Sequence, residues 1–187
     1  SRLRLVQADM RDFDLGRRFP LVTVPYRAFM HLLEPEDQQR CLMTLREHLR
    51  DDGRLILDTW VPRLSALESF LGRPGADVPR LCDEYLLDGG RVTLRHYNRT
   101  SCDEPRQLLS EESILVEADA QGAVLRAVSV PLVRRWTTVR ELGHLVRSCG
   151  FRTEAVYGDF DGGPLTADSV EMVWVLRKDR NEPSHAT

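Results

Sequence analysis

The chain has 187 residues, of which 42% are hydrophobic, enough for one domain with a buried core. Its 26 Lys and Arg against 29 Asp and Glu give a formal charge of −3. This excludes a bulk electrostatic attraction to nucleic acid or to an anionic membrane, so a small molecule or another protein is the expected partner. The four cysteines form no CxxC pair, so neither a zinc site nor a redox motif is indicated. No apolar run reaches the roughly 20 residues that span a bilayer, and we expect a cytoplasmic protein with reduced thiols.

The first expected element is a short strand over residues 3–10. Leu3, Leu5 and Val6 supply its apolar positions, and it ends at Ala8, Asp9 and Met10. The opening SRLRLVQ has no initiator Met and lacks the features of a secretion signal. We therefore expect a partial or processed chain that begins inside a strand.

A second strand is predicted at Phe19–Val24. Its sequence FPLVTV is almost continuously apolar and rich in β-branched residues, as in strands covered on both faces. Pro25 interrupts the hydrogen-bond ladder, so Tyr26 and Arg27 are expected at the strand exit.

A helix is predicted from Pro35, because proline suits the first turn and the following Glu36 and Asp37 complement the helix dipole. Gly53 is expected to end this helix. The apolar face recurs at helical spacing through Leu42, Leu45 and Leu49. The next run, 54–60 (RLILDTW), predicts a buried strand parallel to the first, since a helix joins the two.

Beyond this point the pattern changes to alternating segments between residues 79 and 136, separated by the turns DGG, SCDEP and DAQG. This is typical of an antiparallel sheet. Thr138 and Glu141 form a capping box for a helix that ends at Gly150. Strands are expected at 151–157 and 170–176. No linker divides the chain, so we expect a single domain, 1–187, with an inserted sheet at 79–136.

The order of these elements and their motifs resemble the class I S-adenosylmethionine-dependent methyltransferases. QADMRDF resembles that family's strand-3 exit, FPLVTVPYRAFMHL its strand-4 motif, and LREHLRDDGRLILDTW the helix and strand 5 that follow. The final pattern, WTTVRELGHLVRSCGFRTEAVYGDFDG and then VEMVWVLRK, is similar to the helix, strand 6 and reversed strand 7 that close the sheet. Within the family, the likeness is to small-molecule N-methyltransferases of the amino-sugar and glycine or sarcosine type, which also carry an antiparallel insertion after strand 5.

The resemblance implies an α/β, Rossmann-like sheet in which strands 3 to 7 are present and the first two βα units are absent. The family's glycine-rich motif I, of the D-x-G-x-G kind, and its strand-2 acid have no counterpart here. The glycines of DGGR at 88–91 and of DGG at 161–163 lie between antiparallel strands and precede no helix. The missing stretch would be on the order of 60 to 100 residues, and the chain alone is expected to bind S-adenosylmethionine poorly.

The resemblance places the cofactor against two strand exits, with a carboxylate at the first to accept a hydrogen bond from the adenine amine. The expected cofactor contacts are Ala8, Asp9, Met10, Pro25, Tyr26 and Arg27. The alternative for Asp9 is that it caps the following turn.

Two residues are candidates for catalysis. Tyr26 can offer a hydrogen bond where donor and acceptor meet, and His31 can act as a general base because imidazole titrates near neutrality. A structural role is the alternative for His31. The expected acceptor contacts are Arg27, Trp60, Tyr157 and Phe160, with Trp60 and its neighbour Asp58 at the end of a strand. An aromatic wall there would favour a cationic sulfonium or acceptor.

The inserted sheet carries further candidates for an acceptor pocket, and a solvated strand face is their alternative. These are His96, Tyr97, Arg99, Arg134, Arg135 and Trp136.

Three hypotheses about function remain. The first is methyl transfer to a small-molecule acceptor, at an amine nitrogen rather than at oxygen; a homodimer is allowed. The second is a non-catalytic remnant or subunit that pairs with another chain through an exposed sheet edge. The third, a nicotinamide-dependent reductase, also needs an upstream glycine fingerprint and explains the strand exits less well.

Overall fold

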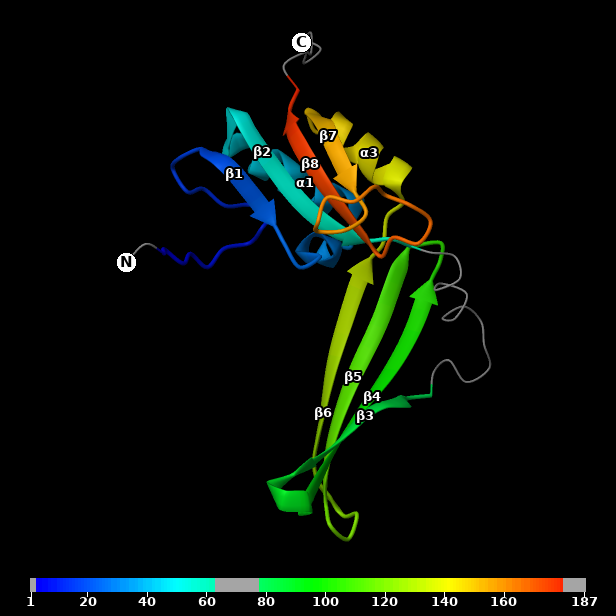
Figure 1. Ribbon diagram of the computed structural model, residues 1–187. Coiled ribbons are helices and arrows are strands. Elements are labelled where there is room, and N and C mark those ends of the chain that lie inside the picture. The colour runs from blue at the N-terminus through cyan, green and yellow to red at the C-terminus, as the bar shows by residue number, and fades with distance from the viewer. Residues whose placement is uncertain (1–2, 63–77, 180–187) are drawn as a thin grey trace. The chain divides into compact units, whose positions relative to one another are not determined.

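The computed structural model describes residues 3–62 and 78–179 (Figure 1). The chain divides into two compact units, one made of residues 1–61 and 136–187 and the other of residues 62–135. The first unit contains a mixed α/β sheet, and the second contains the antiparallel sheet that the sequence predicts after the second buried strand.

Four strands form the mixed sheet in the order β1-β2-β8-β7. β1 and β2 are parallel, as predicted, whereas β8 is antiparallel to both of its neighbours, β2 and β7. The strands are β1 (Phe19–Val24), β2 (Leu49–Trp60), β7 (Phe151–Tyr157) and β8 (Glu171–Lys178).

Three helical segments belong to the same unit: η1 (Ala28–His31), α1 (Pro35–Glu47) and α3 (Val139–Ser148). The predicted start of α1 is confirmed, with Pro35 in the first turn beside two acidic residues. The predicted capping box of α3 is also confirmed. The Thr138 hydroxyl accepts from the Glu141 N–H at 3.2 Å, and the Glu141 carboxylate accepts from the Thr138 N–H at 3.3 Å.

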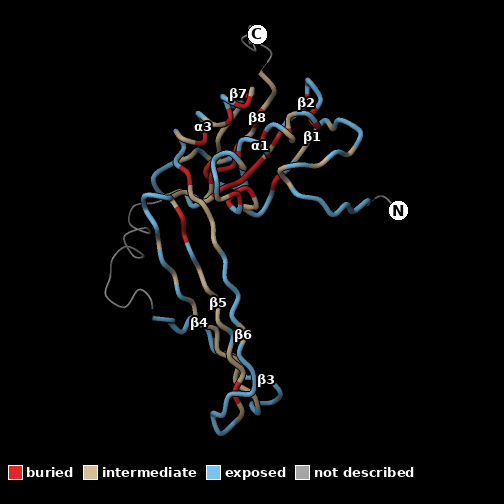
Figure 2. The backbone as a smooth tube through the Cα atoms, turned by 180° about the vertical axis from the view of Figure 1, so that it is seen from behind, coloured by how far each residue is buried: buried red, intermediate tan, exposed pale blue. Residues whose placement is uncertain are grey.

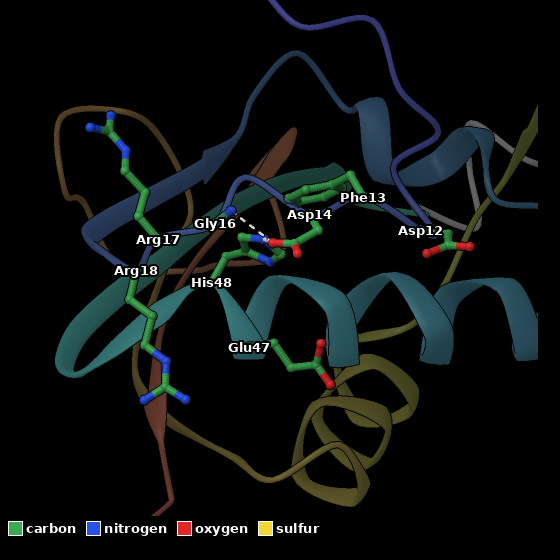
Figure 3. Close-up of a pocket in the computed structure, with 8 residues that line it drawn as sticks. All are labelled: Asp12, Phe13, Asp14, Gly16, Arg17, Arg18, Glu47 and His48. Carbon is green, nitrogen blue, oxygen red and sulfur yellow. Dashed lines mark hydrogen bonds and ion pairs between the residues drawn. The ribbon is translucent and has the colours of Figure 1, made fainter.

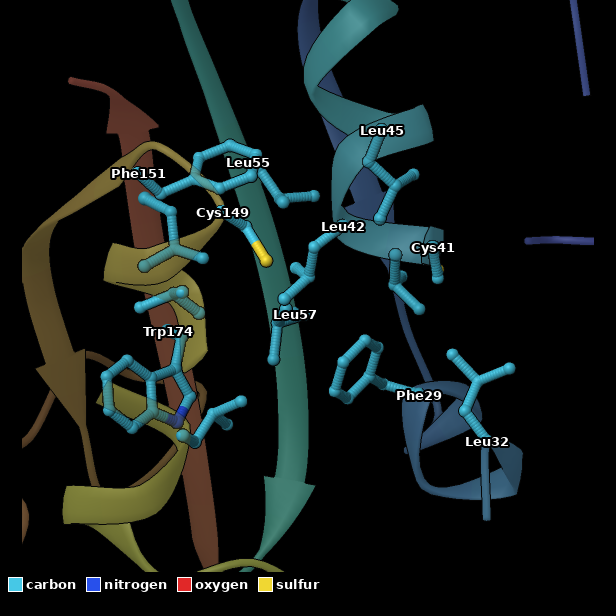
Figure 4. Packing of buried hydrophobic residues seen from close by; sticks show 14 of the residues in the cluster. Phe29, Leu32, Cys41, Leu42, Leu45, Leu55, Leu57, Cys149, Phe151 and Trp174 are labelled. Atoms are coloured by element: carbon cyan, nitrogen blue, oxygen red, sulfur yellow. The ribbon is translucent and has the colours of Figure 1, made fainter. Parts of the chain in front are cut away.

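The core of this unit lies on one face of the sheet (Figure 4). Leu55 and Leu57 of β2 and Trp174 of β8 pack with Leu42 of α1 and Leu142 of α3, all of them fully or almost fully buried. Each such side chain stabilises the fold by about 1.5 to 3 kcal/mol. In Figure 2 the buried segments concentrate in these strands and helices. Because side chains alternate along a strand, Asp58 and Trp60 project from the opposite face.

The prediction of a strand at residues 3–10 is wrong. These residues form no strand, and the nearest pairing is an isolated bridge between Asp9 and Asp12. Leu3, Leu5 and Val6 are exposed. In a doubly wound sheet of order 3-2-1-4-5-6 the third strand pairs with the second alone. The strands described here offer no such partner, so an apolar pattern by itself does not produce a strand.

Two further expectations need correction. The first helix ends at Glu47 rather than near Gly53, because His48 caps it and the buried Leu49 already pairs with Phe19 at the start of β2. The expectation that β1 is covered on both faces is also wrong. Leu21, on one face of β1, is 50% exposed, and among the described strands β1 pairs with β2 alone.

The second unit is a four-stranded antiparallel sheet in the order β3-β4-β5-β6. Its strands are β3 (Arg80–Leu87), β4 (Val92–Asp103), β5 (Leu108–Asp119) and β6 (Val124–Arg135), with η2 (Asp88–Gly90) between the first two. All of β3 is exposed. Cross-strand ion pairs such as Arg95–Glu84, at 2.7 Å, run along the sheet. Among the described residues, no helix has the length and apolar character needed to cross a membrane.

Candidate active-site edge

One edge of the mixed sheet gathers most of the predicted site residues. β1 and β2 are parallel, and β7 runs in the same direction as β2 because each is antiparallel to β8. Their carboxyl ends therefore meet at one edge, where ligands bind in open α/β sheets. The segment that joins β1 to α1 leaves from the same edge. We refer to this edge of the sheet as the carboxyl edge.

Strand register fixes how three strand ends line up there. Asp58 of β2 pairs with Val173 of β8, which pairs in turn with Tyr157 of β7. Two strand spacings put the backbones of Asp58 and Tyr157 about 10 Å apart, with both side chains on one face. Trp60 lies directly opposite Glu171 on that face, which is the face that α1 and α3 do not cover. A row of aromatic and acidic side chains results.

A strained turn follows β1 at this edge. Tyr26 has a φ of 61° and Arg27 a φ of 57°, so two consecutive non-glycine residues adopt the left-handed conformation. The Arg27 N–H donates to Oδ2 of Asp58 at 2.9 Å, and the backbone of Tyr26 also donates to this carboxyl. The Tyr26 side chain is 95% exposed. The Tyr26 phenol is thus exposed to solvent, while the backbone of the turn is bound to the Asp58 carboxylate.

Opposing effects act on the pKa of the Asp58 carboxyl. The residue is only 4% exposed, and burial raises the pKa of its carboxyl, with a further contribution from the negative charge of Glu171. The hydrogen bonds from the turn and the charge of Arg27 oppose this rise in pKa. The Arg27 guanidinium pairs with Glu171, with Nε 3.1 Å from Oε2. One arginine and two carboxylates therefore form a linked, partly buried cluster.

Asp9 lies in the loop that precedes β1. Its carboxylate is gripped by Arg11, whose Nη2 lies 2.7 Å from Oδ2 and whose backbone N–H lies 2.9 Å from Oδ1. These bonds lower the pKa of Asp9 to about 2. Arg11 also bonds Asp37, at 2.8 Å, in the first turn of α1. Arg11 thus links this loop to the first turn of α1, which begins at the carboxyl edge. The hydrogen bond from the Arg11 backbone N–H is the contact expected if Asp9 caps the following turn. The role of Asp9 in cofactor binding stays a prediction.

The other predicted residues differ in exposure. Met10 is partly buried against the core, and Ala8 is exposed. His31, the last residue of η1, is exposed although the preceding Phe29 and Met30 are buried. Phe160 is 69% exposed in the loop after β7. Trp60 is partly buried, and its backbone N–H donates to the Met30 sulfur at 3.4 Å.

The candidates on the inserted sheet are engaged within their own unit. His96 contacts Asp83 through Nδ1 at 3.3 Å and the Ser113 hydroxyl through Nε2 at 2.8 Å. Arg99 pairs with Glu112, and Arg134 with Glu111. These side chains make cross-strand contacts, and their place in an acceptor pocket stays a prediction; Trp136 falls in the first unit.

A cavity of about 440 Å³ lies away from the carboxyl edge (Figure 3). It sits at the carboxyl end of α1, beside the start of β1, where the Phe19 N–H donates to the His48 carbonyl at 2.8 Å. His48 is buried, and its Nε2 accepts from the Leu15 N–H at 3.0 Å. None of the predicted site residues lines it; its lining is Asp12, Phe13, Asp14, Gly16, Arg17, Arg18, Glu47 and His48.

Sequence reasoning missed two parts of the edge. The sequence pattern indicates Asp58 at a strand end without a role, and it does not mark Glu171. A charge inside the apolar run RLILDTW is a signal for Asp58, because buried carboxylates need partners. No local signal marks Glu171, which meets Arg27 across 144 positions of sequence.

Comparison with known proteins places this geometry in context. No protein-family model matches the chain. The chain is 27% identical over 173 residues to the cypemycin N-terminal methyltransferase of a Streptomyces species. The match covers 92% of this chain and 64% of that protein, so the chain spans slightly less than two thirds of this relative.

Solved structures share the fold. The CcbJ methyltransferase from Streptomyces caelestis superimposes with a TM-score of 0.73 at 21% identity, over 93% of this chain and 63% of that one. CalS10, an amino pentose methyltransferase from Micromonospora echinaspora solved with bound S-adenosylmethionine, matches with a TM-score of 0.60 at 22% identity. That match covers 90% of this chain and 62% of CalS10. The chain is thus similar in sequence to a natural-product N-methyltransferase, and it shares its fold with S-adenosylmethionine-dependent methyltransferases.

Proposed function

We propose that the protein transfers a methyl group from S-adenosylmethionine to an amine nitrogen of a small molecule. The observation that carries the proposal is the match along 92% of the chain to an enzyme named for N-terminal methylation. The amino pentose substrate class named for CalS10 points to the same kind of acceptor.

The chemistry of the carboxyl edge supports an amine acceptor. Methyl transfer from a sulfonium is an in-line displacement, so the protein mainly aligns donor and acceptor and lets a proton leave the amine. The aromatic side chains of Tyr26, Trp60 and Tyr157 suit a cationic donor or acceptor. Asp58 and Glu171 supply two carboxylates to this cluster, and Arg27 supplies one positive charge. When both carboxylates are ionised, the cluster has a net negative charge, which attracts an ammonium group.

The cofactor fits this edge in part. Tyr26 and Arg27 stand where the methionine part of the cofactor is expected, and Asp9, held by Arg11, remains the proposed contact for the adenine. The helices α1 and α3 are preceded by Glu34 and Thr138 rather than by a glycine-rich turn. The described residues therefore supply the acceptor side of the site better than the side that would hold the ribose.

A specific observation favours a second candidate, a non-catalytic subunit that pairs with another chain. β1 lies at one edge of the described sheet, with β2 as its one described partner, and its Leu21 is 50% exposed. An unpaired apolar edge of this kind is a template for strand addition.

Radiolabelled methyl transfer separates the two candidates. The protein expressed from the start codon of its gene is incubated with methyl-labelled S-adenosylmethionine and a panel of amino sugars and short peptides with free amino termini. The N-acetylated form of each acceptor serves as its control. We expect label on the free amines alone. Transfer to hydroxyl groups would overturn the nitrogen assignment, and no transfer to any acceptor, with a stable complex with another polypeptide, would favour the subunit.

A further inference from the structure

The turn after β1 adopts a conformation that its residues do not favour. Left-handed backbone costs on the order of 1 kcal/mol or more at each non-glycine residue, and it persists only where the surroundings impose it. Tyr26 and Arg27 adopt it consecutively. The other non-glycine residues with positive φ in the described chain, Asp88 and Gln107, lie in the connections between strands of the inserted sheet, and neither adjoins another such non-glycine residue. Something must hold the turn at the carboxyl edge.

Asp58 is placed to do so. Val24, the last residue of β1, pairs with Leu57, so Asp58 follows directly beyond the paired region. Its carboxylate receives backbone N–H groups from both strained residues. Successive N–H groups that converge in this way form a concave anion site, and here the anion is a side chain of the protein itself. The left-handed conformation of the turn is therefore the one in which its N–H groups donate to the buried Asp58 carboxylate.

Burial of the Asp58 carboxylate lowers the stability of the fold. A carboxylate that is 4% exposed loses most of its hydration, and the neighbouring Glu171 adds repulsion that Arg27 offsets. An apolar residue at this position of β2 would extend the run RLIL without that cost. A costly group with directed bonds to a strained turn suggests a role other than stability.

We infer that Asp58 is a positioning residue: its carboxylate holds the Tyr26–Arg27 turn in the left-handed conformation and so fixes where the exposed Tyr26 phenol meets the methyl acceptor. The second half of this inference rests on the proposed function. The phenol itself is 95% exposed, so the backbone of the turn sets its position.

Amide hydrogen exchange tests the first half without any assay of activity. Exchange of the Tyr26 and Arg27 amides is compared between wild type, Asp58→Asn, and the control Thr59→Val. Thr59 is the next residue of β2, equally buried, and its hydroxyl has no hydrogen-bond partner in the described structure. We expect these two amides to lose protection about tenfold in Asp58→Asn, because a neutral acceptor replaces a charged one. Unchanged protection in Asp58→Asn, or an equal loss in Thr59→Val, would overturn the inference.

A second variant covers the case in which Asp58→Asn folds poorly. Glu171→Gln breaks the Arg27 ion pair but keeps the bonds from the turn to Asp58, so both amides should stay protected. A loss of protection of about tenfold in Glu171→Gln would show that the ion pair holds the turn and would refute the role of Asp58.

Kinetics test the second half in the protein expressed from the start codon of its gene. Asp58→Asn should lower kcat more than it weakens binding of S-adenosylmethionine. If Asp58 acts through the phenol, its effect on kcat should nearly vanish in a Tyr26→Phe background, since residues that act as a unit are not additive. Additive effects would overturn this half. Absence of methyl transfer in the wild type would defeat the proposed function, while the exchange result would still decide the role of Asp58 in the turn.

Discussion

The carboxylates of Asp58 and Asp9 respond to opposite environments within one unit. Burial raises the pKa of Asp58, whereas the hydrogen bonds from Arg11, with its charge, lower the pKa of Asp9 to about 2. The first residue therefore resists ionisation and the second favours it. This difference gives each a distinct signature in pH-dependent measurements.

The pH dependence of stability should reveal Asp58. Its pKa in the folded protein lies above the ordinary 3.8, so the folded state binds this proton more tightly than the unfolded state. The free energy of unfolding that this group contributes should fall as pH rises from about 4 through its folded pKa. Denaturant unfolding of wild type and Asp58→Asn at a series of pH values measures this contribution as their difference.

Asp9 and Glu154, whose pKa values are lowered to about 2, act with the opposite sign at lower pH, but they are common to both proteins. A wild type that gains stability relative to Asp58→Asn as pH rises above 4 would contradict the raised pKa.

Asp9→Ala should weaken binding of S-adenosylmethionine about tenfold if the carboxylate meets the adenine amine, because a charged hydrogen bond is lost. Asp12→Ala removes a neighbouring exposed acid of the same loop and is the matched control. Calorimetric titration of both variants measures the change. Equal affinities would assign Asp9 to capping the turn with Arg11.

At the scale of elements, the capping box of α3 is a local device with a local test. Thr138→Ala should lower the free energy of unfolding by about 1 kcal/mol, since the Glu141 N–H loses its acceptor. Thr138→Ser keeps the hydroxyl and should retain most of the stability. Chemical denaturation of the two variants measures the difference, and an equal loss in both would show that the methyl group, not the cap, matters.

The elements that the sequence predicts well are those specified locally. The 19–24 and 151–157 strands have the predicted bounds, and the start of α1 and the box of α3 follow from their first-turn residues. Residues 3–10 fail because a strand needs a neighbour that the apolar pattern does not reveal. Gly53 misleads because Leu49, which reads as part of a helical face, is taken into β2 by its pairing with Phe19.

At the scale of the whole molecule, the sequence predicts which strand exits form the candidate site but not how their side chains connect. Tyr26, Trp60 and Tyr157 follow from topology, because the carboxyl ends of β1, β2 and β7 meet at one edge. The Arg27–Glu171 pair and the bonds from the turn to Asp58 join segments far apart in the chain. Such contacts depend on how β1 and β8 align with β2, which no local pattern sets.

Calorimetric titration with S-adenosylmethionine and S-adenosylhomocysteine tests the proposed methyl transfer at its first step, cofactor binding, in the protein expressed from the start codon of its gene. A nicotinamide dinucleotide is the control ligand. We expect binding of both sulfur compounds at one site per chain, weakened by Asp9→Ala, and no binding of the dinucleotide. Binding of the dinucleotide with no response to either sulfur compound would contradict it.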